Sequence, residues 1–278
     1  MIIKFKLIYI IIFILIFSCS KKTEQATTLK EKNLESQMIE LYNEGIKEFE
    51  KGDVIFAGRK FSEAELLFPQ SIWAPRAVLM SAYGYFSQGY YSNALNDLER
   101  FVIKYKDHPQ IDYAYYLMAL CHYDQIVDEK KDMNEILQAK KYFELIVNDY
   151  PNTDYAKDSK FKLEYITELM ASKEMYLARY YLQREKWIPA IKRFQNVVKN
   201  YDKTIYVEEA LHRLVELNYK IGLIDEAEKY ALLLGYNYRS SKWYEASYKL
   251  LNKNYKTKKI SSKEEKETIL KKFKLLFK

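Results

Sequence analysis

The stretch LYNEGIKEFEKGDVIFAGRKFSEAELLFP, residues 41–69, contains one complete unit of a helical pattern that repeats along the chain. Apolar residues recur in it with helical spacing, and a Gly-Asp pair separates two helical segments. Gly45 and Ala57 lie twelve residues apart, a spacing that brings small side chains together in a helical hairpin. Ala64, seven residues further on, leaves room for a neighbouring hairpin, and Pro69 ends the unit. The stretch therefore predicts a hairpin that stacks on further hairpins.

The same unit recurs four more times, which is typical of tetratricopeptide repeats. Glycine and proline are scarce, with 7 and 5 residues, which argues against a turn-rich β fold. We therefore predict an all-α fold, a tetratricopeptide-repeat superhelix of about five helical hairpins, whose last unit is degenerate as a terminal repeat should be. The marks of the second to fifth units are Ala82, Ala94 and Phe101; Ala119, Ala139, Ile146 and Pro151; Ala178, Ala190 and Val197; and Val215, Ala227 and Leu234.

The repeats are not evenly spaced. Successive alanines of the second helices are separated by 37, 45, 51 and 37 residues, whereas a strict array repeats every ~34 residues. The excess predicts longer helices and inserted loops. We assign residues 125–135 to an inserted loop, and residues 154–170 to an extension of the helix that joins the third and fourth repeats.

The first nineteen residues, MIIKFKLIYIIIFILIFSC, have the layout of a secretory signal: two lysines, a short apolar run and a small residue at the cut. The apolar run is too short for a permanent transmembrane helix. The string at residues 15–19 resembles a bacterial lipobox, in which Cys19 receives lipid. The alternative is an ordinary secretory signal that contains a cysteine. We predict a lipoprotein signal peptide over 1–18 and a flexible tether over 19–35 that starts from lipidated Cys19.

Charge and reactive residues exclude several classes of function. Removing the two lysines of the signal, and the eleven lysines and three glutamates of residues 249–278, from the net charge of +7 leaves −3 for the body. A nucleic-acid binder needs a basic face on the fold itself, so we predict none. The three histidines have no metal-ligand spacing, and we find no phosphate loop, catalytic triad or HExxH motif. We therefore predict no enzyme activity, no metal and no cofactor.

Residues 249–278 form a basic tail with the pattern of a short amphipathic helix. Ser262 and Glu265 have the spacing of a capping box. Ile269, Phe273 and Leu276 then recur at helical spacing among lysines. Such a helix suits an anionic lipid surface or an acidic partner. The alternatives are a capping helix packed on the last repeat, or disorder.

Several strings resemble the BamD family, the tetratricopeptide lipoproteins of the outer-membrane β-barrel assembly machine. They are HPQIDYAYYLMALCHY (108–123), YPNTDYAKDSKFKL (150–163), EMYLARYYLQREKWIPAIKRFQNVVKNY (174–201) and LERFVIKY (98–105). The resemblance covers roughly residues 36–234. Ala119, where the family often has glycine, and Asp202, where it has proline, depart from the pattern, and the basic tail is not a shared feature.

The resemblance implies a non-catalytic subunit, lipid-anchored at the periplasmic face of the outer membrane. Within a repeat domain at 36–248, the half up to about residue 172 would receive unfolded outer-membrane proteins by an aromatic-ended strand. The half after it would dock the barrel-forming subunit BamA, beside other lipoproteins of the complex. The alternative is another periplasmic tetratricopeptide lipoprotein, a scaffold for cell-envelope or division proteins.

Two groups of residues are candidates for these contacts. Aromatic side chains in the first half suit peptide capture because they offer large area with few rotamers, although many will fill hairpin interiors. Arginines in the fourth hairpin suit interface ion pairs, although a solvated helix face would explain them equally. For Arg100 in the first half, the alternative to pairing with a bound strand is an ordinary salt bridge. The substrate candidates are Tyr42, Trp73, Tyr83, Tyr85, Tyr90, Arg100, Asp112, Tyr113 and Tyr116. The docking candidates are Arg179, Arg184, Lys192 and Arg193.

Overall fold

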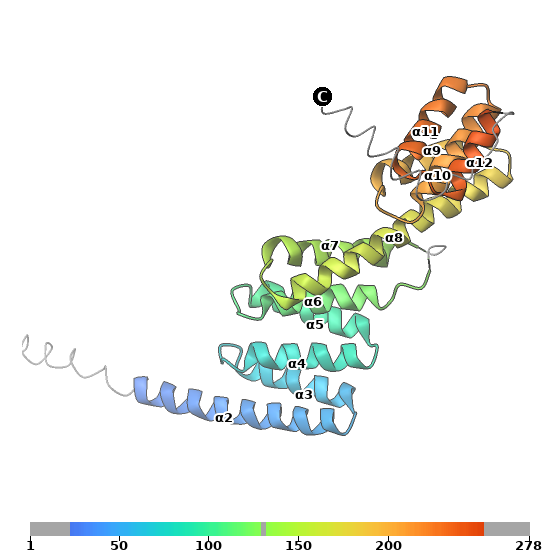
Figure 1. Cartoon of the computed structure of the whole chain (residues 1–278). Coiled ribbons are helices and arrows are strands. Elements are labelled where there is room, and N and C mark those ends of the chain that lie inside the picture. Colours follow the sequence, from blue (N-terminus) through green and yellow to red (C-terminus); the bar gives the residue numbers. More distant parts are fainter. Residues whose placement is uncertain (1–22, 129–131, 253–278) are drawn as a thin grey trace, which may run out of the picture. The chain divides into compact units, whose positions relative to one another are not determined.

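The computed structural model describes residues 23–128 and 132–252, and within these ranges the regular structure is entirely α-helical (Figure 1). The described helices follow one another as hairpins, which confirms the predicted all-α tetratricopeptide fold. The chain divides into two compact units. The first unit extends to Val127 and continues from Met133 to Leu163, and the second unit holds the residues from Glu164 onward.

Three hairpins make up the first unit, and Figure 1 shows them stacked in chain order from α2 to α7. The second unit holds two further hairpins and one additional helix. The first unit contains α2 (Thr23–Glu50) with α3 (Val54–Leu67), α4 (Ala74–Ser87) with α5 (Tyr91–Lys104), and α6 (Ile111–Tyr123) with α7 (Asn134–Asp149). The long helix α8 (Asp154–Gln183) begins in the first unit and leads, in the second, to α9 (Trp187–Asn200), α10 (Val207–Lys220) with α11 (Ile224–Asn237), and α12 (Lys242–Leu251).

The small residues that define the repeats lie at the helix contacts, as predicted. The paired positions of the second hairpin, Ala82 and Ala94, have no exposed surface, and neither have Ala178 and Ala190 of the fourth. Four residues after the alanine of the second helix, a large side chain fills each of the first four hairpins. These side chains are Phe61, Leu98, Phe143 and Phe194, all fully buried.

Irregular spacing between repeats arises where the sequence predicts it. Helix α6 ends at Tyr123 and α7 begins at Asn134, so the interval between them contains the predicted loop at 125–135 except its last two residues, which belong to α7. Helix α8 has 30 residues and includes the whole of the predicted extension at 154–170. The extension is confirmed, and the loop lies where it is predicted but ends two residues earlier.

The predicted tether is wrong in part. Helix α2 begins at Thr23, so most of the stretch assigned to a flexible tether at 19–35 is helical. The reason is visible in its composition, because residues 23–44 lack glycine and proline and are rich in Glu, Leu, Gln and Lys, which favour helix. The signal at 1–18, Cys19 and the tail from residue 253 lie outside the described residues. No helix in the described ranges is long and apolar enough to cross a membrane.

Candidate functional site

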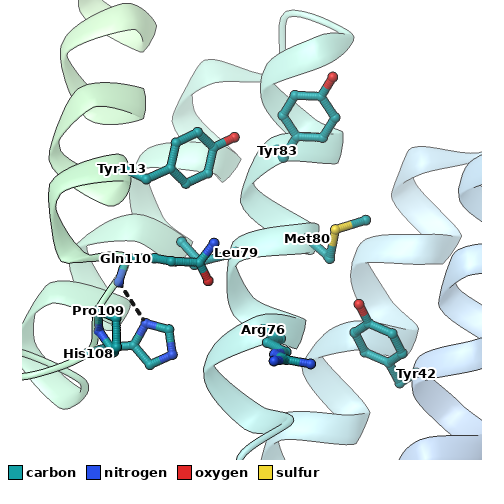
Figure 2. Close-up of a pocket in the computed structure, with 9 residues that line it drawn as sticks. All are labelled: Tyr42, Arg76, Leu79, Met80, Tyr83, His108, Pro109, Gln110 and Tyr113. Carbon is teal, nitrogen blue, oxygen red and sulfur yellow. Dashed lines mark hydrogen bonds between the residues drawn. The ribbon is translucent and has the colours of Figure 1, made fainter. Parts of the chain in front are cut away.

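A cavity of about 660 Å³ opens in the first unit, on the side of the first helices of the three hairpins. Figure 2 shows its lining. His108, Arg76 and Tyr42 lie in that order across one end, Tyr83 and Tyr113 lie at the other, and Leu79 and Met80 lie between. The lining residues are Tyr42 from α2; Arg76, Leu79, Met80 and Tyr83 from α4; His108, Pro109 and Gln110 from the turn before α6; and Tyr113 from α6.

Helix geometry explains why these positions meet. Relative to the small residue Ala82, Arg76 lies six residues earlier, Leu79 three residues earlier, and Tyr83 one residue later. At about 100° per residue these three positions share one helix face, turned away from the hairpin contact. Tyr42 lies three residues before Gly45, which is the position of Leu79. Tyr113 lies six residues before Ala119, the small residue of α6, which is the position of Arg76. Stacked hairpins therefore bring the five side chains to one surface.

The turn before α6 holds His108 in a defined orientation. The backbone N–H of Gln110 donates to His108 Nδ1 at 3.2 Å, and the imidazole meets the Phe101 ring edge-on at 5.5 Å. Burial, and the positive charge of Arg76 next to it, lower the pKa of His108. The imidazole is therefore neutral near pH 7, with Nδ1 accepting and Nε2 carrying the proton.

Arg76 supplies a cation to the cavity. Its guanidinium lies 5.2 Å from the Trp73 ring, and that ring lies 5.4 Å from Tyr42. In the part of the chain that the structure describes, no carboxylate forms an ion pair with Arg76. A guanidinium fixed by an aromatic ring and without an internal partner is suited to an anionic group of a ligand.

The hydroxyls of Tyr42 and Tyr113 stay protonated at neutral pH. Burial raises the pKa of Tyr42, and raises the pKa of Tyr113 to about 12. Each hydroxyl therefore offers a donor and an acceptor beside an apolar floor. The cavity combines a cation, neutral hydrogen-bonding groups and apolar surface, which suits an extended peptide with a carboxylate and an aromatic side chain.

Four of the nine predicted substrate residues belong to this site. Tyr42, Tyr83 and Tyr113 line the cavity, and Trp73 borders it through its contacts with Tyr42 and Arg76. The remaining five candidates do not line it. They are Tyr85, Tyr90, Arg100, Asp112 and Tyr116.

Internal contacts account for three of those five. Arg100 forms ion pairs with the buried Glu65 and with Asp97, at 3.1 and 3.0 Å, so its guanidinium has internal partners. The Tyr116 hydroxyl donates to Asp158 of α8 at 2.6 Å. The Tyr85 ring packs so closely on α3 that a Cβ at Gly58 would overlap it.

Six lining residues were not among the sequence candidates. They are Arg76, Leu79, Met80, His108, Pro109 and Gln110. A rule based on spacing would have selected Arg76 and Leu79, because both precede Ala82 by the intervals that face the cavity. His108 and Pro109 begin the string that resembles the BamD family, but nothing local marks them as lining a cavity.

The four docking candidates of the second unit do not form one cluster. Arg179 makes two hydrogen bonds to Glu209 of α10, at 2.6 and 3.1 Å. Arg193 contacts both carboxylate oxygens of Glu174, at 2.9 and 3.1 Å. The Arg184 guanidinium lies 4.1 Å from the Tyr180 ring, and Lys192 is exposed on α9. Two of the three arginines are thus engaged within the second unit.

Comparison with known proteins identifies the family. A family model described as "Outer membrane lipoprotein", named YfiO, matches residues 34–233. A protein of Rickettsia prowazekii named outer membrane protein assembly factor BamD is 40% identical over 215 residues, which are 77% of this chain and 85% of the relative. The Caulobacter vibrioides protein of the same name is 36% identical over 236 residues, 85% of this chain and 76% of the relative. The chain belongs to the BamD family.

The matched region includes the whole candidate site. Every residue that lines the cavity and all four docking candidates lie within 34–233. Helix α12 and the basic tail lie beyond it. No group of three or more His, Cys, Asp or Glu side chains in the described ranges is arranged to hold a metal ion.

Proposed function

We propose that this protein is an outer-membrane protein assembly factor, a non-catalytic subunit of the complex that assembles β-barrel proteins. Its first unit would receive unfolded outer-membrane proteins in the periplasm, and its second unit would dock the barrel-forming subunit. The names of its relatives support the general role. The observation that carries the substrate role is the cavity, in which Arg76, without an acidic partner among residues 23–128 and 132–252, lies among tyrosines.

The chemistry of the cavity favours the C-terminal end of an extended strand. Such an end offers a carboxylate for Arg76 and an aromatic side chain for the tyrosines at 83 and 113. Arg is suited to carboxylates because its planar fork donates two parallel hydrogen bonds. Tyrosine gives a large rigid contact and loses little entropy when a peptide binds.

The test measures binding of a fluorescent peptide that ends in phenylalanine. Arg76→Glu should weaken its binding at least tenfold, about 1.4 kcal/mol. The matched control is Arg59→Glu on α3, the second helix of the first hairpin. Arg59 is exposed and does not line the cavity. A peptide with an amidated C-terminus should bind wild type and Arg76→Glu about equally, because the carboxylate that the arginine reads is missing.

The proposal fails if Arg59→Glu weakens binding as much as Arg76→Glu does. Crosslinks of the peptide that fall only beyond Lys173 would also contradict it. Indifference to removal of the terminal phenylalanine would show that the tyrosines do not read an aromatic end.

Membrane attachment through Cys19 is part of the same proposal. The layout of residues 1–19 supports it, and several acyl chains hold a soluble domain firmly because each buried CH₂ contributes about 0.8 kcal/mol. Cys19→Ala should leave an uncleaved precursor or release the protein from the outer membrane. A variant that is processed and fractionates like wild type would refute the anchor.

A further inference from the structure

The last described helix of the second unit has apolar surface that it does not bury. Helix α12 packs on the fifth hairpin: Leu250 and Leu251 contact the core around Val215, and Ser247 is fully buried. Its apolar side chains nevertheless cover about 200° of the helix circumference at 100° per residue. This is wider than the single stripe of about 100° that one-sided packing needs. Apart from Ser247, its apolar and aromatic side chains stay partly exposed.

The neighbouring helix α11 also exposes apolar residues. Leu232 and Tyr236, one turn apart, are 64% and 81% exposed. The second helix of each hairpin is called its outer helix. Leu232 of α11 occupies the position that Gln195 has in α9, the outer helix of the preceding hairpin. Gln195 reaches α11 by donating to the Tyr230 hydroxyl at 3.0 Å. The first three outer helices carry Ser62, Glu99 and Glu144 at this position. Only the fifth repeat has a large apolar residue where a further outer helix would pack.

The two surfaces adjoin. Gly235 of α11 lies so close to α12 that a Cβ there would approach the Tyr244 ring to 2.7 Å. On α11 this glycine is about 60° from Leu232 at 100° per residue. A helix lying alongside α12 would therefore cover Leu232 and Tyr236 as well. In residues 23–128 and 132–252, no helix occupies that position.

We propose that the tail of this chain, residues 262–278, is the missing helix, and that it completes a sixth hairpin with α12. The tail lies outside the described residues, and its pattern fits the surface. Ile269, Phe273 and Leu276 make one apolar face behind a capping box. The nine residues between Asn252 and Ser262 span up to about 30 Å when extended, which is ample for a return along α11.

The position of the end of α12 sets the direction of the returning helix. The end of α12 lies beside the beginning of α11, because Leu250 and Leu251 pack against the cluster of Val215, Ala227 and Ala231, whereas Tyr244 lies beside Gly235 near the end of α11. Asp225 and Glu228 are exposed in that first part of α11. A tail that runs back from there passes this part of α11 first, and its early residues carry two lysines, 263 and 266, and three glutamates, 264, 265 and 267, so charge does not decide the direction. Its apolar face then reaches Leu232 and Tyr236 about two turns later.

The first test is a disulfide between Leu232→Cys and Phe273→Cys in the full chain. Burial raises the pKa of Cys121 to about 12, so this native thiol does not compete. Under mild oxidation the pair should form at least tenfold faster than the control pair Ile205→Cys and Phe273→Cys. Ile205 is a suitable control because it is 79% exposed in the same unit. Equal rates for the two pairs would overturn the proposal.

The second test is hydrogen exchange of the amides at 263–276. Leu232→Asp with Tyr236→Asp should speed their exchange at least tenfold. Leu66→Asp with Ile103→Asp should leave it unchanged, although these outer-helix residues are 72% and 78% exposed. Unchanged exchange in the first variant would overturn the proposal. Protection of the tail that appears only with phosphatidylglycerol vesicles would also overturn it, because the occupant of the apolar face would then be lipid.

Discussion

At the scale of single residues, close packing between the helices of a hairpin depends on residues that lack bulk. Gly45 in α2 faces Phe61 of α3, and a Cβ added to this glycine would lie 2.7 Å from the ring. Phe61 is fully buried and contacts the core around Met38 and Ala57, so it cannot swing away. The twelve-residue spacing that predicts the hairpin is therefore a steric requirement.

We expect Gly45→Ala to destabilise the protein. Alanine gains about 1 kcal/mol of helix propensity over glycine, but overpacking a filled core costs about 1–3 kcal/mol. Chemical denaturation should show a net loss of about 1 kcal/mol. In a Phe61→Leu background, Gly45→Ala should lower the free energy of unfolding by less than it does in wild type. Full additivity of the two changes would contradict the proposed contact.

A second residue-scale effect is electrostatic. Glu216 in α10 lies 3.6 Å from His212 and 2.6 Å from Arg213. The hydrogen bond from His212 is the largest cause that lowers the pKa of Glu216 to about 2, with Arg213 adding to it. The carboxylate thus binds protons less readily in the folded state than in the unfolded state, whose pKa is near 4.5.

Because folding lowers the pKa of Glu216, the free energy of unfolding decreases as the pH falls. The contribution of Glu216 is fully present above about pH 4.5 and disappears as the pH falls toward 2. Because the side chain is 37% exposed, solvent screening reduces the effect to about 1 kcal/mol. Between about pH 5 and 2.5, wild type should lose about 1 kcal/mol more unfolding free energy than Glu216→Gln. Parallel losses in urea titrations of the two proteins would count against this account.

At the scale of elements, one turn geometry connects the helices of four hairpins. In each of these four hairpins, a residue with positive φ lies two residues before the start of the second helix. These residues are Gly52, Gly89 and Gly222, with φ of 86°, 76° and 86°, and Glu185, with φ of 57°. Three of these turns use glycine, which adopts this backbone region without strain. The fourth holds a glutamate there, at a cost of about 1 kcal/mol or more.

We therefore expect Glu185→Gly to stabilise the protein by about 0.5 kcal/mol. The gain is smaller than the relieved strain because glycine also increases the entropy of the unfolded chain. Gly222→Ala, the reciprocal change, should destabilise by about 1 kcal/mol. Thermal unfolding of the two variants checks both signs. A stabilised Gly222→Ala would rule out the shared geometry.

At the scale of the whole molecule, the role of Arg193 distinguishes internal stability from partner docking. The Arg193–Glu174 pair joins α9 to α8, with side chains that are 41% and 14% exposed. Arg193→Glu places two carboxylates together and should cost about 1 kcal/mol of stability. If the guanidinium also contacts the barrel-forming subunit, co-purification of that subunit should fall at least tenfold.

The swapped pair separates these effects. Glu174→Arg with Arg193→Glu restores an internal ion pair of opposite direction, so the melting temperature should return close to that of wild type. Partner recovery should stay low, because the cation at position 193 is still missing. A swap that restores both the melting temperature and the partner would assign Arg193 to internal stability alone.

The sequence by itself determined the repeat architecture of this protein. Hairpins are local: residues twelve apart must be small, positive φ selects glycine, and both requirements can be read within one unit such as residues 41–69. The long helix α8 and the inserted loop at 125–135 follow from spacing alone. The inner-face positions that hold Tyr42, Tyr83 and Tyr113 follow from helix periodicity.

Only the tertiary structure decided which chemical groups remain available. Arg100 and Tyr116 looked like binding residues until their partners 35 and 42 positions away, Glu65 and Asp158, were placed beside them. Arg76 has no described acidic partner, and His108 comes from a turn between repeats, so no local pattern marks either one. The physical reason is that ion pairs and cavities depend on distances between hairpins, whereas periodicity records only the face of a single helix.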